Sequence, residues 1–382
     1  MITMNGFSRT FALMTSALRV DTGAADDETL AAGLATPDLE WTYLLRMADQ
    51  EHITGALTVS LRRRGLFDDL PRAGRDALHR RYFMGTEFNT RIKSQAEEAV
   101  RLLNSAGCTP MLLKGGLYLF ETPPEALGGR VLRDLDMVVP GDALEACVGV
   151  LREAGYVPEG EHDSWTYHYR PLHHKDKIVP IELHVRPGEQ RNFITVEETW
   201  AEAVPIEAAG LKMVALAPAH RVMHNIFHSE IQDAGFALGA VCLRQLCDLA
   251  AICVGFTESL DWRSIESRME RHGMGRLFRA RMHLAVQLLG APAPDITIDG
   301  LRSRLHLRHC LIKQRSPRLT YLTRWIAGIA GPFKRYHLDL LYKCGTSGFG
   351  LQVHRVKHLG KLMIRYRSGI WNRLTKRGKS LQ

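Results

Sequence analysis

Three features that would place a protein in a membrane or outside the cell are missing from this sequence. It has no run of eighteen apolar residues, so no membrane-spanning helix is expected. The first stretch of the chain lacks a dense basic start and a long apolar core, and we interpret it as a helix rather than a signal peptide. The seven cysteines are odd in number and form no Cys-x-x-Cys pair, which argues against a disulfide framework or a zinc ribbon. We therefore expect reduced thiols and a cytoplasmic protein.

Acidic residues are almost absent from the last part of the chain. Residues 301–382 contain 19 lysines and arginines but only one acid, Asp339, a net charge of +18, whereas residues 1–300 carry a net charge of −9. Such an arm suggests an anionic partner. Three interpretations stay open: contact with an RNA or DNA backbone, peripheral attachment to an anionic membrane, or a solvated face of a helical domain. Four aromatic residues interleave with the basic ones, but no nucleic-acid module is recognisable: Tyr336, Tyr342, Tyr366 and Trp371.

The rest of the composition is that of a globular protein, with 45% hydrophobic and 24% charged residues. Apolar spacing predicts helices through residues 1–105, including a long one over 72–104 that Gly107 ends. Strands and helices alternate over 106–210, helices return over 211–300, and 301–382 form the basic helical segment. This order predicts an α+β fold with an α/β core and a small mixed sheet. The first segment is expected to pack on that sheet, with substrate binding as the alternative.

Residues 111–139 carry the most informative pattern. An apolar strand ends at Lys114, Gly115-Gly116 form a turn, and a short helix over 117–121 follows. A second strand then carries Asp134 and Asp136, which strand alternation places on one face. Two such carboxylates repel each other unless a cation lies between them, and divalent metals suit this arrangement. A Gly-Gly turn before a helix lets backbone N–H groups approach a phosphate.

Two later stretches add further candidates. Residues 165–170 and 178–185 are predicted to pair as a hairpin, and in the second strand Glu182 and His184 share a face. Helical spacing stacks three imidazoles, which could hold zinc but more often pair with nearby acids such as Glu230 and Asp233: His220, His224 and His228.

Together, the Lys-Gly-Gly turn, the Asp-x-Asp strand and the later Glu-x-His strand resemble the DNA polymerase β-like nucleotidyltransferase superfamily. More narrowly, they are similar to a largely uncharacterised bacterial group. The resemblance covers roughly residues 103–185 and more loosely the helices to about 252. It implies that three acids hold the metals, with Glu182 replacing the more usual aspartate: Asp134, Asp136 and Glu182. It also implies a phosphate-binding set, in which the two arginines could instead pair with the acids: Lys114, Gly115, Gly116, Arg130 and Arg133. His184 could orient substrate or simply pack in the sheet.

The implied activity is transfer of a nucleoside monophosphate from a nucleoside triphosphate (NTP) to an acceptor, with release of pyrophosphate and with Mg²⁺ or Mn²⁺. The acceptor could be a small molecule, a peptide or protein, or RNA. We favour a tailoring reaction on a small molecule or peptide, because no RNA-specific domain is visible. The alternative is a non-catalytic protein of the same fold that docks on nucleic acid or an anionic membrane through its basic arm.

Overall fold

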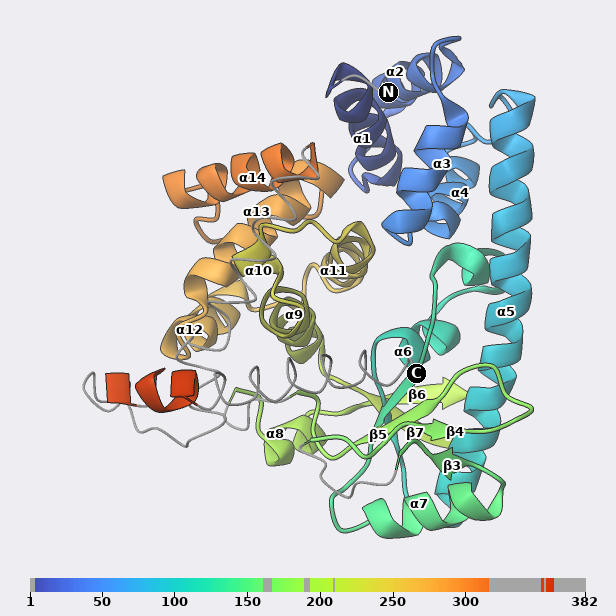
Figure 1. The fold of residues 1–382 in the computed structure, drawn as a ribbon, viewed down its shortest axis with the longest axis vertical. Helices are drawn as coiled ribbons and strands as arrows, with labels where there is room; N and C mark the ends of the chain where they lie inside the picture. The colour runs from blue at the N-terminus through green and yellow to red at the C-terminus, as the bar shows by residue number, and fades with distance from the viewer. Residues whose placement is uncertain are drawn as a thin grey trace, which may run out of the picture. The chain divides into compact units, whose positions relative to one another are not determined.

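The computed structural model describes residues 4–160, 167–188, 193–208, 210–315, 352–353 and 355–360 (Figure 1). The chain forms two compact units, Met1–Arg315 and Ser316–Gln382. In the second unit the few described residues are helical, and most of the predicted basic arm, with its four aromatic residues, lies outside the described residues. No helix in the described ranges is both long and apolar enough to cross a bilayer.

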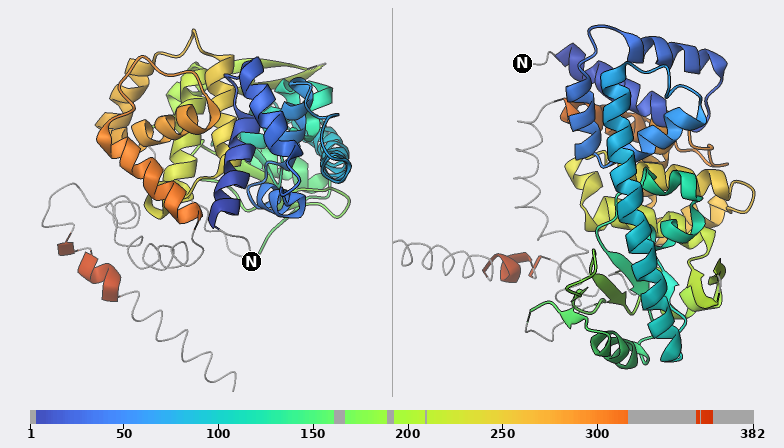
Figure 2. Two further views of the ribbon diagram at one scale, coloured as in Figure 1. Left: turned by 90° about the horizontal axis from the view of Figure 1, so that it is seen from above. Right: turned by 90° about the vertical axis from the view of Figure 1, so that its right-hand side faces the viewer.

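The chain before the first strand is helical, as the sequence predicted, and its described residues form five helices: α1 Met4–Leu18, α2 Ala24–Ala35, α3 Trp41–Gln50, α4 Thr54–Arg63 and α5 Arg72–Ser105. Helix α5 confirms the long helix expected over 72–104, and it ends before Gly107, whose φ of +75° favours glycine. Near its start, Ala77 and Leu78 belong to a core made by helices, whereas residues 92–103 belong to the core of the sheet. One rigid helix therefore fixes the helical core to the sheet, as Figure 2 shows from the side.

A mixed seven-stranded sheet forms the centre of the first unit, in the order β3-β4-β5-β2-β1-β7-β6. The strands are short: β1 Met111–Leu112, β2 Leu135–Val138, β3 Val157–Pro158, β4 Leu172–His173, β5 Ile181–His184, β6 Val204–Ala208 and β7 Leu211–Ala215. β2 pairs in parallel with β5, and β1 in parallel with β7, while the other pairs are antiparallel. This sheet among helices confirms the predicted α+β class with a mixed sheet.

Four short elements lie between the strands: α6 Lys114–Glu121, the 3₁₀ helix η1 Pro124–Gly129, α7 Leu144–Glu153 and α8 Val196–Ala201. Helix α7 follows the strand that carries Asp136, as expected. The predicted hairpin is present in part: residues 165–166 lie outside the described residues, His168 bridges His184 in antiparallel register and the Tyr169 N–H donates to Leu183 O (2.6 Å), but the regular strand of the hairpin is β4 at Leu172–His173.

The prediction that helix resumes at residue 211 is wrong. Leu211–Ala215 form strand β7, in which Met213 and Ala215 alternate into the sheet core. β7 pairs antiparallel with β6 and lies beside β1, with Val214 opposite Met111. β6, which ends three residues earlier, pairs with all five residues, whereas β1 pairs with two, so a short hairpin that the sequence analysis did not recognise defines this segment.

Helices return after β7: α9 Pro218–Phe227, the π-helical turn η2 His228–Gln232, α10 Gly235–Leu238, α11 Leu243–Gly255, α12 Trp262–Arg271, α13 Gly275–Leu289 and α14 Leu301–Gln314. Their apolar faces share one core with helices α1, α3 and α4. The first four helices thus share a core with these later helices, and both α5 and the packing of α4 on η1 connect them to the part of the chain that carries the sheet. This combined helical part lies over one end of the sheet in Figure 1.

Candidate active site

Two acids from different strands meet because β2 and β5 are parallel neighbours. In their register Asp136 lies opposite Glu182, and Val138 lies opposite His184. Alternation sends Leu135 and Met137 into the sheet core, so Asp136 points to the other face. Glu182 and His184 follow it on the same face, as the sequence predicted.

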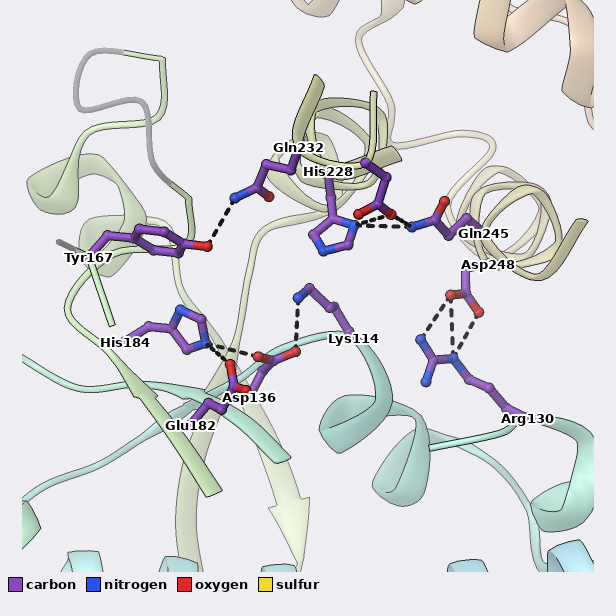
Figure 3. Close-up of polar contacts among 11 residues, drawn as sticks. Lys114, Arg130, Asp136, Tyr167, Glu182, His184, His228, Gln232, Gln245 and Asp248 are labelled. Atoms are coloured by element: carbon purple, nitrogen blue, oxygen red, sulfur yellow. Dashed lines mark hydrogen bonds and ion pairs between the residues drawn. The ribbon is translucent and has the colours of Figure 1, made fainter. Parts of the chain in front are cut away.

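The three side chains form a compact group (Figure 3). His184 Nε2 donates to Asp136 Oδ1 (2.8 Å) and lies 3.8 Å from Glu182 Oε2. One ligand atom from each residue lies within 4.8 Å of the others. Asp136 is 2% exposed. Carboxylate oxygens and imidazole nitrogens are common ligands of divalent cations in proteins. The residues present therefore fit a metal ion.

Asp134 lies next to this group but outside its compact set. It is half-buried and precedes the first residue of β2. Burial raises the pKa of Asp134, and the charge of Asp136 raises it further, while Lys114, Arg130 and Arg244 oppose the increase. The charges of Asp134 and Asp136 therefore interact, but the compact set consists of Asp136, Glu182 and His184 and does not include Asp134.

Lys114 provides the nearest positive charge. The structure starts helix α6 at Lys114 rather than at Leu117, so Gly115 and Gly116 form its first turn instead of a turn before it. Lys114 has a φ of +44°, a left-handed conformation that is costly for a residue with a side chain. Its Nζ lies 2.9 Å from Asp136 Oδ2. Burial raises the pKa of Asp136, but Lys114 and His184 together lower it more, so the net pKa is well below the usual range.

The glycines let other groups come close. A Cβ on Gly115 would lie 2.6 Å from Arg130 Nη1 and 2.9 Å from Leu132 Cγ, so only glycine fits without displacing them. No side chain caps helix α6, and its first-turn N–H groups stand at the positive end of the helix. Gly116 has more room, since its Cβ would meet nothing closer than Asp136 O at 3.6 Å.

The two predicted phosphate-binding arginines already have partners. Arg130 is 8% exposed and donates three hydrogen bonds to Asp248: Nε to Oδ1 (3.0 Å), Nε to Oδ2 (3.3 Å) and Nη2 to Oδ2 (3.0 Å). Arg133 is exposed, and its Nη2 lies 2.8 Å from His52 Nε2. Neither arginine pairs with Asp134 or Asp136, which was the alternative expectation.

The predicted histidine face has three different surroundings. His220 Nε2 lies 3.5 Å from Glu198 and 3.7 Å from Glu202, on the side of helix α8. His224 is buried, its Nε2 has no hydrogen-bond partner among the described residues, and burial lowers its pKa to about 3. His228 Nδ1 lies 3.0 Å from Gln245 Nε2 and 3.3 Å from Asp233 Oδ2. The three imidazoles therefore do not form one zinc site.

A cavity of about 410 Å³ lies between helices α6, α9 and α11, beside the acids. In Figure 3, Lys114 extends between Asp136 on the sheet and His228 on the helical side. Four cationic side chains line this cavity: Lys114, Arg130, Arg221 and Arg244. The first three pair with Asp136, Asp248 and Glu121 respectively. Arg244 has no hydrogen bond or ion pair within the described part of the chain, so its guanidinium is available to a ligand.

Sequence reasoning missed the groups that helix α11 contributes to this cavity, namely Arg244, Gln245 and Asp248. One signal was present. Asp248 is an acid within the apolar spacing of Leu246, Leu249 and Ala250, where an uncompensated charge would be costly. Its partner Arg130 could not be read from this pattern, since it lies 118 residues earlier.

A mixed sheet with acids on adjacent parallel strands, beside a helix that begins Lys-Gly-Gly, defines an enzyme of the nucleotidyl-transferring class. The chain belongs to the family described as "Uncharacterised nucleotidyltransferase", which it matches over residues 37–290. This range runs from helix α3 to helix α13, so the family unit includes the helices on both sides of the sheet and is longer than the stretch that carried the resemblance. Comparison with curated proteins finds no match, and comparison with solved structures finds none either.

Proposed function

We propose that this nucleotidyltransferase transfers a nucleoside monophosphate from an NTP to an oxygen nucleophile on an acceptor. The acceptor oxygen bonds to the α-phosphorus, the bond from that phosphorus to the β-phosphate oxygen breaks, and pyrophosphate leaves. The observation that carries the proposal is the juxtaposition of Asp136, Glu182 and His184 with Lys114, at the edge of a cavity large enough for a ligand.

Asp136 and Glu182 are the residues that would hold a divalent metal such as Mg²⁺ or Mn²⁺, with Asp134 and His184 beside them. Bound there, the metal would offset triphosphate charge and make the acceptor hydroxyl more acidic. Glu182, which is less buried than Asp136, is the carboxylate placed to accept the proton that a hydroxyl acceptor loses.

Two cationic side chains and the N-terminus of helix α6 are the groups that would bind the phosphates. Lys114 lies between the acids and the cavity, and the first turn of helix α6 offers Gly115 and Gly116 N–H groups. Arg244 adds a guanidinium that has no hydrogen bond or ion pair among the described residues, whereas Arg130 is paired with Asp248. We assign Arg130 to holding helix α11 against the start of β2, close to Gly115, and Arg133 to the His52 contact.

The reaction is tested by incubating the protein with ATP, CTP, GTP and UTP in turn, with Mg²⁺ or Mn²⁺ and a cell extract as the source of acceptors. We expect pyrophosphate release with at least one nucleotide, and a loss of about a hundredfold in Glu182→Gln, because a positioned general base contributes at least that factor. The exposed Glu153→Gln serves as the matched control. Nucleotide binding without turnover under all conditions would contradict the proposal.

Arg244→Met is expected to raise the KM for the NTP about tenfold or more, because a charge-assisted hydrogen bond to phosphate is lost. Arg244→Lys should show an intermediate KM, since lysine keeps the charge but not the planar fork. Steady-state kinetics with varied NTP measures both, with the exposed Arg308→Met as control. An unchanged KM in Arg244→Met would remove Arg244 from the phosphate site.

A further inference from the structure

A second cavity, which we name the apolar chamber, lies on the other side of the Arg130–Asp248 ion pair. Its volume is about 520 Å³. Helices α4 and α11 and the segment after helix α1 form most of its wall. Aliphatic side chains dominate its lining, including Leu18, Val20, Ile53, Ala56, Val59 and Val254.

The chamber and the first cavity meet at a shared boundary. Residues that line both include Tyr118, Arg130, Arg244 and Asp248. Arg130 Nη1 would lie 2.6 Å from a Cβ on Gly115, and the preceding residue, Lys114, pairs with Asp136 at 2.9 Å, which places this boundary beside the acids. A ligand in the chamber could therefore present one end to the reacting phosphate.

The two cavities differ in what they can recognise. The first offers an amide and two imidazoles, Asn225, His224 and His228, and so can hydrogen-bond to a nucleoside. Polar groups of the chamber outside the shared boundary include His52, which bonds Arg133, and Ser60, whose hydroxyl donates to Ala17 O. A wall of alanine, valine, leucine and isoleucine gives a nucleobase no partners, but it lowers the free energy of an apolar body by taking it out of water.

The cationic side chains that line the chamber indicate the chemistry of the polar end of its ligand. Arg130 is neutralised by Asp248, whereas Arg63 and Arg244 have no hydrogen bond or ion pair among the residues that the structure describes. Both are cations, so they favour an oxygen-rich head over an amine. Leu18 and Val20 precede residue 37, where the family match begins. The wall of the chamber therefore includes residues from outside the matched range.

We propose that the chamber binds the acceptor, a small molecule with an apolar body and a hydroxyl or carboxylate head. This inference rests on the proposed function. The body lies among the aliphatic side chains, and the head oxygen faces the boundary where Arg244 lies. Attack on the α-phosphorus then forms the new O–P bond and releases pyrophosphate, and a hydroxyl head passes its proton to a carboxylate of the site.

Binding is tested first, without catalysis, by fluorescence titration with 1-anilinonaphthalene-8-sulfonate, an apolar aromatic probe with an anionic group. Val254→Trp and Ala56→Trp place bulk in the chamber, and Val204→Trp is the control. Val254 is 50% exposed and Val204 is 40% exposed, so a larger side chain at either position can extend into solvent and the variant should fold. Val204 lines neither cavity. We expect chamber variants to bind the probe about tenfold more weakly than wild type and Val204→Trp. Equal affinities in all four proteins would overturn the proposal.

Transfer is tested with α-³²P-labelled NTPs and an organic-solvent extract of cells, followed by butanol partition. We expect label in the butanol phase, lost by about tenfold in Val254→Trp but not in Val204→Trp, with NTP affinity equal in both. Label confined to RNA, protein or water-soluble products, formed equally by the two variants, would overturn the proposal. Failure of every protein to bind or turn over NTP would instead contradict the proposed function, and the probe titration would still decide whether the chamber takes apolar ligands.

Discussion

Replacing Asp136 with asparagine is expected to reduce nucleotidyl transfer by about a thousandfold or more. Asp136 is the central member of the site: it accepts from His184, pairs with Lys114 and lies in register with Glu182. Asparagine keeps the size of the side chain but removes the charge around which these groups are arranged. Electrostatic contributions of this kind are worth about 10² to 10³ each, and groups that act as a unit fail together.

Pyrophosphate release and label transfer measure this effect, and thermal unfolding checks the fold. Asp142→Asn is the matched control, because Asp142 is exposed and follows the same strand. Lys114 loses its ion pair in Asp136→Asn, but it is 27% exposed and can turn to water, so the variant should remain folded. Transfer that stays within tenfold of wild type would show that the chemistry does not take place at this group.

The second large effect is on stability. Arg281→Met is expected to lower the free energy of unfolding by about 3–5 kcal/mol, because it leaves a buried carboxylate without its partner. Arg281 is 1% exposed and Glu230 4%, and Arg281 Nη1 lies 3.2 Å from Glu230 Oε1. Burial raises the pKa of Glu230, and Arg281 is the charge that opposes this increase.

This pair matters to the site because of where Glu230 lies. The π-helical turn His228–Gln232 carries both Glu230 and His228, and His228 faces Lys114 across the first cavity (Figure 3). Holding Glu230 against helix α13 therefore fixes the turn that presents His228. We expect weaker NTP binding in Arg281→Met, in addition to the loss of stability.

Urea denaturation measures the stability change. The double variant Glu230→Gln/Arg281→Met should recover much of the loss, because neither charge is then left buried alone. Arg279→Met is the control on the same helix. Its partners Glu266 and Glu270 are partly exposed, so a loss of no more than about 1 kcal/mol is expected. A loss below about 1 kcal/mol in Arg281→Met itself would show that water or another cation replaces the guanidinium.

Features that depend on neighbours in the chain were predictable. Alternation along a strand placed Glu182 and His184 on one face, and helical spacing predicted α5 nearly to its ends. The start of α6 was less predictable, because Lys114 takes a left-handed conformation that its residue type disfavours. The strand at Leu211–Ala215 was missed because the short hairpin that it forms with β6 was not recognised in the sequence, and its two pairs with β1 depend on the tertiary structure.

By itself, then, the sequence determined the α+β class, the family, and the pairs of acids and glycines that a nucleotidyl transfer needs, since each is a local pattern of a few residues. The tertiary structure alone decided how these pieces are used. It paired Arg130 with Asp248, left Arg244 without an ion pair among the described residues at the boundary of two cavities, and enclosed an apolar chamber between the first helices and helix α11. The physical reason is that ion pairs and cavities depend on which surfaces meet across long stretches of chain, and no short-range periodicity encodes that meeting.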